Sequence, residues 1–173
     1  KINDSLLIYF AGHGIIKDDY GYWLPKNAEK EDDSFWIPND YVTKKIKSIK
    51  ANNILVIADS CYSGTLTRGI ASSEGQKKPL INSYLKTKSR MVISSGGIKP
   101  VLDGGGGGHS IFARSIITEL RTLNSPFTST DLYTAIVKKV TKISQKLGLE
   151  QKPMLSSIVR SLHEGPDFVF LPK

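Results

Sequence analysis

Three short runs of apolar residues divide the sequence. They read SLLIYFAG at 5–12, NILVIADS at 53–60 and RMVISSGG at 90–97. Each run is continuous and stops at small or polar residues, which is typical of strands covered on both faces. We therefore predict three central strands in the first hundred residues.

Helical spacing follows between and after these runs. In NDYVTKKIKSIK at 39–50 the apolar residues recur every three or four positions behind a cap at Asn39 or Asp40. A strand, a helix and a second strand predict a right-handed parallel crossover. Two further helices are expected at 109–123, capped at Ser110, and at 130–147.

The inward face of the helix at 109–123 is predicted from the same spacing. Its expected members are Ile111, Ala113, Ile116, Ile117 and Leu120.

The remaining segments complete the predicted fold. Residues 65–89 are polar and rich in turn formers, so we expect a loop with a short helix near 80–85. DFVFLP at 167–172 is predicted to be a last strand. Alternating strands and helices indicate an α/β protein, a three-layer α/β/α sandwich with a mostly parallel central sheet. The length of 173 residues suits one domain.

Composition narrows the functional classes. The chain holds 24 Lys and Arg against 16 Asp and Glu, a formal charge of +8. The basic residues are scattered and lack interleaved exposed aromatics, so we expect no specific nucleic-acid site. No run approaches the roughly 18 apolar residues of a membrane helix, and we expect no membrane association. A single cysteine excludes an internal disulfide and favours a reducing, cytoplasmic location.

Two residues with catalytic chemistry follow the first two predicted strands. His13 follows the first in YFAGHG, and Cys61 follows the second in IADSCYSG. The carboxyl ends of parallel strands meet at one edge of a sheet, where ligands bind. A thiolate nucleophile needs a nearby imidazole, and histidine can also protonate the leaving group. A lone cysteine at a strand end is more often a small buried hydrophobic residue. The prediction of catalysis therefore depends on His13 and Cys61 occurring together.

The glycines beside these two residues suit close approach to a substrate. Gly14 and Cys61 would direct backbone N–H groups into the space between the two side chains, as an oxyanion hole does. This arrangement suits acyl transfer.

The motifs YFAGHG and DSCYSG resemble the histidine and cysteine motifs of the caspase-like cysteine peptidases, with the metacaspases and their bacterial relatives the most similar. The resemblance continues through YGYWLP, MVISSGG and GHSIFARSIITEL. It implies a cysteine endopeptidase in which Cys61 attacks and His13 moves the proton. A phosphate-binding fingerprint is missing, which disfavours nucleotide binding.

The resemblance also implies specificity for basic P1 residues. Asp59 stands two residues before Cys61, where caspases proper have a glutamine, and a carboxylate there would attract Arg or Lys. Asp103 precedes the helix at 109–123, and Ser95 follows the third strand; both are candidates for the same pocket. The alternatives are that Asp59 caps the turn after its strand, that Asp103 is an ordinary turn residue and that Ser95 only ends a strand.

The resemblance divides the chain into a large-subunit-like part at 1–68, a linker at 69–89 and a small-subunit-like part at 90–173. Cleavage of the 65–89 region by the enzyme itself is then expected. The candidate basic residues are Arg68, Lys77, Lys78, Lys86 and Lys88. The first strand, helix and second strand of the family are missing from this chain, and a preceding segment or a partner chain is expected to complete the sheet.

We expect no cofactor and no metal site. Calcium activation occurs in metacaspases, but Asp18, Asp19, Asp32 and Asp33 look like exposed loop charges rather than a calcium site. The alternative to a peptidase is a caspase-like regulatory or interaction module within a larger protein, with little or no proteolytic activity of its own.

Overall fold

A four-stranded sheet forms the centre of the computed structural model, which describes residues 1–60, 81–96 and 108–171. The first three strands run parallel and the last runs antiparallel to its neighbour. In spatial order the strands are β1 (Ser5–Ala11), β5 (Asn53–Asp59), β6 (Ser89–Ser94) and β8 (Met154–Ser157). The three strands predicted from the apolar runs are confirmed.

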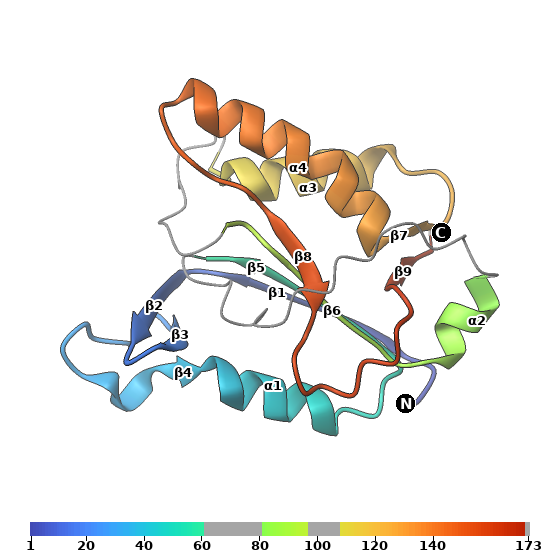
Figure 1. The fold of residues 1–173 in the computed structure, drawn as a ribbon, viewed down its shortest axis with the longest axis horizontal. Helices are drawn as coiled ribbons and strands as arrows, with labels where there is room; N and C mark the ends of the chain where they lie inside the picture. Colours follow the sequence, from blue (N-terminus) through green and yellow to red (C-terminus); the bar gives the residue numbers. More distant parts are fainter. Residues whose placement is uncertain (61–80, 97–107, 172–173) are drawn as a thin grey trace.

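Helices cover both faces of this sheet (Figure 1). α3 (Ile111–Thr122) and α4 (Ser129–Lys146) lie on one face, and α1 (Asn39–Ser48) lies on the other. Each face has its own buried apolar cluster, one including Phe112 and the other including Ile46. The α/β/α sandwich is confirmed.

Burial along the strands follows from these layers. Every residue of β5 and β6 is buried, because both strands are central and covered on both faces. β1 alternates between partly buried and exposed positions. Its even-numbered side chains from Leu6 to Phe10 pack on the α1 side, while Leu7 and Tyr9 on the other face are 45% and 47% exposed.

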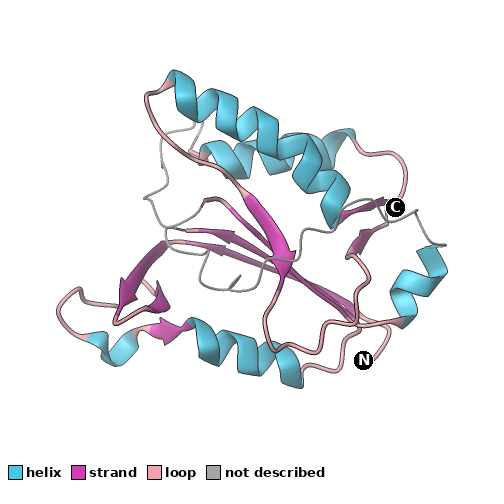
Figure 2. Cartoon of the chain, viewed as in Figure 1, coloured by secondary structure: helices cyan, strands magenta, loops and turns pink. Residues whose placement is uncertain are grey.

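A small antiparallel sheet follows β1 and was not predicted. Its strands pair in the order β2-β3-β4 and lie beside the start of α1 (Figure 2). They span β2 (His13–Lys17), β3 (Tyr20–Leu24) and β4 (Ile37–Pro38), with a 3-10 turn η1 (Asp33–Phe35) before β4. β2 and β3 are short and are separated by a tight turn at Asp18 and Asp19, both with positive φ. The sequence therefore contains no long apolar run from which these strands could be predicted.

The predicted helix caps are partly right. Ser110 caps α3 by accepting from the N–H of Ala113. The prediction for α1 was wrong, because Pro38 occupies the cap position and makes no side-chain cap bond. In α4 the cap is Thr128, which forms a reciprocal capping box with Asp131. On α3, Leu120 is 38% exposed and does not face the core as predicted.

The end of the chain departs from the expected topology. The predicted last strand, β9 (Val169–Phe170), pairs with β7 (Phe127–Thr128) in a separate two-stranded sheet. Residues near 80–85 do form a short helix, α2 (Ile81–Lys86). In the ranges the structure describes, no helix combines the length and the apolar character needed to cross a bilayer.

Candidate active site

The carboxyl ends of β1 and β5 are joined by a backbone hydrogen bond. Ala11, the last residue of β1, is in register with Asp59, the last residue of β5. The next N–H, that of Gly12, donates to the carbonyl oxygen of Asp59 at 3.3 Å. Gly12, immediately before His13, is therefore hydrogen-bonded to Asp59, two positions before Cys61.

His13 lies exposed at the start of β2, opposite Leu24. Its placement depends on Gly12, since a Cβ built there would lie 3.0 Å from Cζ of Phe10. The Phe10 ring is in turn stacked on Trp23 of β3, with centroids 4.2 Å apart. Packing of the β2–β3 hairpin on β1 thus fixes the path of the chain after β1 and, with it, the position of the His13 backbone.

Gly14 is the second residue of β2 and pairs with Trp23. Neither Gly12 nor Gly14 has a positive φ. Left-handed backbone freedom is therefore not the reason for glycine at either position. At Gly12 the reason is the close approach of the Phe10 ring.

Asp59 is buried at the end of β5, with 8% of its surface exposed. Its Oδ2 accepts a hydrogen bond from the Tyr9 hydroxyl at 3.2 Å and another from the Ser110 hydroxyl. Burial, followed by the charge and the hydrogen bond of Asp59, raises the pKa of Tyr9 to about 12. The predicted selector is thus a carboxylate held by two hydroxyl groups.

Ser95 follows β6 and is fully buried. Its N–H donates to the carbonyl of Ala58 at 2.9 Å, and its hydroxyl donates to the carbonyl of Ser60 at 3.4 Å. The side chain is thus directed to the backbone immediately before Cys61. Cys61 itself and Asp103 lie outside the described residues.

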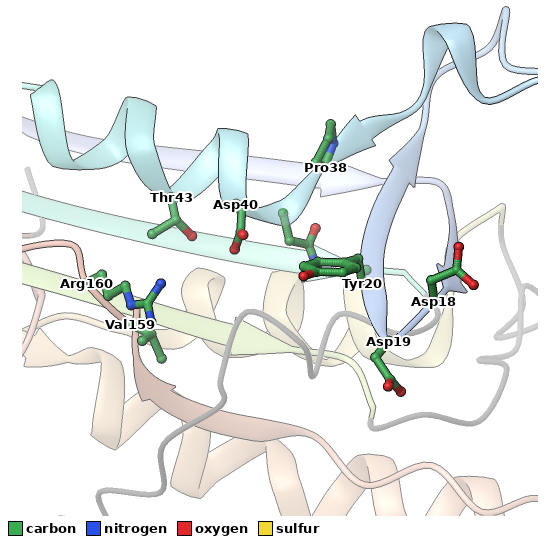
Figure 3. Close-up of a pocket in the computed structure, with 10 residues that line it drawn as sticks. Asp18, Asp19, Tyr20, Pro38, Asp40, Thr43, Val159 and Arg160 are labelled. Atoms are coloured by element: carbon green, nitrogen blue, oxygen red, sulfur yellow. The ribbon is translucent and has the colours of Figure 1, made fainter.

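A separate hollow of about 630 Å³ opens beside the hairpin (Figure 3). It lies between the β2–β3 turn, the start of α1 and the segment after β8. Its charged lining residues are Asp18, Asp19, Asp40 and Arg160. Of the predicted active-site residues that the structure describes, none lines this hollow, which is on the α1 side of the molecule.

The acidic loop residues have local partners where the structure describes them. Asp32 accepts from the N–H of Ser34 at 2.9 Å, which lowers the pKa of Asp32, and Asp33 pairs with Lys17 at 2.5 Å. Within residues 1–60, 81–96 and 108–171, no group of three or more His, Cys, Asp or Glu is placed to hold a metal ion.

Sequence reasoning missed Tyr9 and assigned Ser110 only a helix cap. The only indication for Tyr9 in the sequence is its position in β1. Side chains alternate along a strand, so Tyr9 points to the opposite face from Ile8 and Phe10. That signal does not show which carboxylate the hydroxyl reaches.

A family model described as the caspase domain, Peptidase C14, matches residues 1–163. The chain belongs to the caspase domain family. Membership indicates a cysteine peptidase type of hydrolase in general. A comparison with curated proteins finds no match.

Solved structures show the same fold. Protein GSU0716 from Geobacter sulfurreducens is 16% identical, with a TM-score of 0.54, and the match covers 96% of this chain and 72% of that protein. Caspase-1 from Spodoptera frugiperda is 18% identical, with a TM-score of 0.53. That match covers 90% of this chain and 60% of caspase-1, so the chain spans less than two thirds of that protein.

Proposed function

We propose that this caspase domain is a cysteine endopeptidase of the metacaspase type that cleaves after Arg or Lys. Cys61 attacks the scissile carbonyl, and His13 accepts the thiol proton and later protonates the leaving amine. The N–H groups of Gly14 and Cys61 stabilise the oxyanion, a contribution typically of about 3 kcal/mol per donor. The single cysteine suits a cytoplasmic, reducing environment.

One observation carries this proposal: the hydrogen bond from Gly12 N–H to the Asp59 carbonyl. It supports the view that the chain segments entering His13 and Cys61 start from neighbouring points at the carboxyl edge of a parallel sheet. Active sites of open α/β sheets lie at this edge.

Asp59 is proposed as the residue that selects the basic P1 side chain. Its carboxylate lies at the same edge and is held in one orientation by Tyr9 and Ser110. A fixed carboxylate favours a cationic partner through charge-assisted hydrogen bonds. Asp103 is proposed as a second acid of the pocket. Ser95 is fully buried and stabilises the segment before Cys61 through its hydrogen bond to the Ser60 carbonyl.

The test is turnover of short reporter peptides that end in Arg, Lys or Asp, with and without added calcium. We expect cleavage of the Arg and Lys reporters only, and no cleavage by Cys61→Ala or His13→Ala. Circular dichroism of each variant checks that it is folded. A folded wild-type chain that cleaves none of the reporters would instead support a regulatory or interaction module within a larger protein.

Self-cleavage in the 65–89 region is part of the same proposal. Freshly purified wild-type chain should yield two fragments on a denaturing gel, while Cys61→Ala stays intact. Mass spectrometry of the fragments would identify the basic residue used. A wild-type chain that remains whole while it cleaves reporters would remove self-processing from the proposal.

A further inference from the structure

Two hydroxyl groups from distant parts of the sequence converge on one carboxylate oxygen. The Tyr9 hydroxyl comes from β1 and donates to Asp59 Oδ2 at 3.2 Å. The Ser110 hydroxyl comes from the residue before α3 and donates to the same oxygen. Three elements, β1, β5 and α3, are therefore linked at the carboxyl edge of the sheet.

The register of the sheet explains how Tyr9 reaches Asp59. Tyr9 lies opposite Ile57 of β5, and Asp59 is two residues farther along the same face. A diagonal neighbour at this offset lies within reach of a long aromatic side chain. Because Tyr9 is 47% exposed, its ring buries only part of its surface, and the hydroxyl provides its specific contact.

Ser110 has two bonds that use different parts of its hydroxyl. The oxygen accepts from the N–H of Ala113 at 2.9 Å, and the proton is donated to Asp59. The first bond begins α3, and the second joins this helix end to β5. The partial positive charge at the start of a helix also favours an ionised carboxylate nearby.

We propose that Tyr9 and Ser110 are positioning residues that hold the Asp59 carboxylate in one rotamer, so that a cationic substrate side chain meets a preorganised partner. The inference rests on the proposed role of Asp59 in selecting Arg or Lys. Neither hydroxyl needs to contact the substrate. With its pKa raised to about 12, the Tyr9 phenol stays protonated and remains a donor well above neutral pH.

The kinetic test is Tyr9→Phe, which removes only the hydroxyl from a half-exposed ring. We expect KM for the Arg reporter to rise on the order of ten-fold, the size expected for one lost hydrogen bond to a charged group, with kcat little changed. Tyr41→Phe on α1 is the matched control, because Tyr41 is 52% exposed and lies on the other side of the sheet. It should leave both constants unchanged.

Ser110 requires a pair of variants because it also caps α3. Ser110→Ala should raise KM and lower stability, whereas Ser110→Thr keeps a capping hydroxyl and should restore KM. In an Asp59→Ala background, Tyr9→Phe should have no further effect on KM, because residues that act through one group are not additive. A KM that Tyr9→Phe leaves unchanged would overturn the positioning role.

A second readout needs no turnover. Tyrosine carbon NMR, with the Tyr9 signal assigned by its loss in Tyr9→Phe, should show a lower Tyr9 pKa in Asp59→Asn than in wild type. If no reporter is cleaved but this pKa falls, the peptidase proposal fails and the hydroxyl–carboxylate contact stands. If reporters are cleaved and the pKa does not move, the positioning inference fails alone.

Discussion

A buried charged side chain lies at each end of the central sheet, Asp59 at one and Arg90 at the other. The two side chains differ in the groups to which they are hydrogen-bonded. Asp59 at the carboxyl edge accepts from two side-chain hydroxyl groups. Arg90, near the start of β6 at the opposite edge, is 1% exposed and donates to main-chain carbonyl groups. The four acceptors are the carbonyl oxygens of Ile49, Ala51, Asn52 and Ser89, at 2.6 to 3.2 Å.

The difference separates a charge that joins main-chain segments from a charge that we propose selects the substrate. The Arg90 guanidinium holds the chain between α1 and β5 against β6, and burial lowers its pKa without removing the proton. The Asp59 carboxylate is instead held by the hydroxyl groups of Tyr9 and Ser110, each of which a single substitution can remove. Changing Arg90 should therefore affect stability, while changing Asp59 should affect substrate selection.

The largest expected effect is the loss of stability in Arg90→Met. The variant leaves buried carbonyl oxygens without donors, and we expect the free energy of unfolding to fall by about 3–5 kcal/mol in urea titrations. The exposed Arg121→Met on α3 should stay within about 0.5 kcal/mol of wild type. Unchanged stability in Arg90→Met would mean that the guanidinium is not what holds this edge together.

The second effect concerns Asp59→Asn, which keeps the shape and removes the charge. We expect kcat/KM for the Arg and Lys reporters to fall by about ten- to a hundred-fold, since a hydrogen bond to a charged group contributes about 1.5–3 kcal/mol. Stability should change much less than in Arg90→Met. If the preference for basic reporters survives intact, Asp59 serves the turn after β5 rather than the substrate.

A smaller effect is expected for Gly12→Ala at the entry to His13. The added Cβ would lie 3.0 Å from Phe10 Cζ, so the ring must shift against Trp23. We expect a loss of about 1–2 kcal/mol in unfolding free energy, as for other overpacked sites, and a lower kcat through displacement of His13. In a Phe10→Leu background the added penalty of Gly12→Ala should shrink. Equal penalties in both backgrounds would exclude the ring as the cause.

The smallest effect is a change in the pH dependence of stability. His163 Nδ1 accepts from the N–H of Arg90 at 3.1 Å, and burial lowers the His163 pKa despite nearby Asp167 and Glu164. The folded-state pKa lies below the unfolded one, so this contribution is complete above about pH 6.5 and is lost as pH falls through the folded value. Urea titrations at pH 7.5 and 5.5 should show a smaller loss for His163→Gln than for wild type. An equal loss would assign the acid sensitivity to other groups.

Local sequence patterns were sufficient to predict the central strands, the covering helices and the Ser110 cap. These features depend on local patterns: continuous apolar runs become central strands, and apolar residues at helical spacing become helix faces. The sequence also placed His13 and Asp59 at strand ends, which is enough to predict a common edge. The hairpin β2–β3 and the strand β8 lack such patterns, because they are short and mix polar with apolar residues.

Which side chains meet at the two edges of the sheet depends on how the elements pack together. That Tyr9 reaches Asp59 depends on the register between β1 and β5, and that Ser110 reaches it depends on how α3 packs on the sheet. Arg90 likewise reads as an exposed charge until the turn before β5 folds around it. Hydrogen bonds between residues 38 to 51 positions apart depend on the packing of whole elements, which no local spacing encodes.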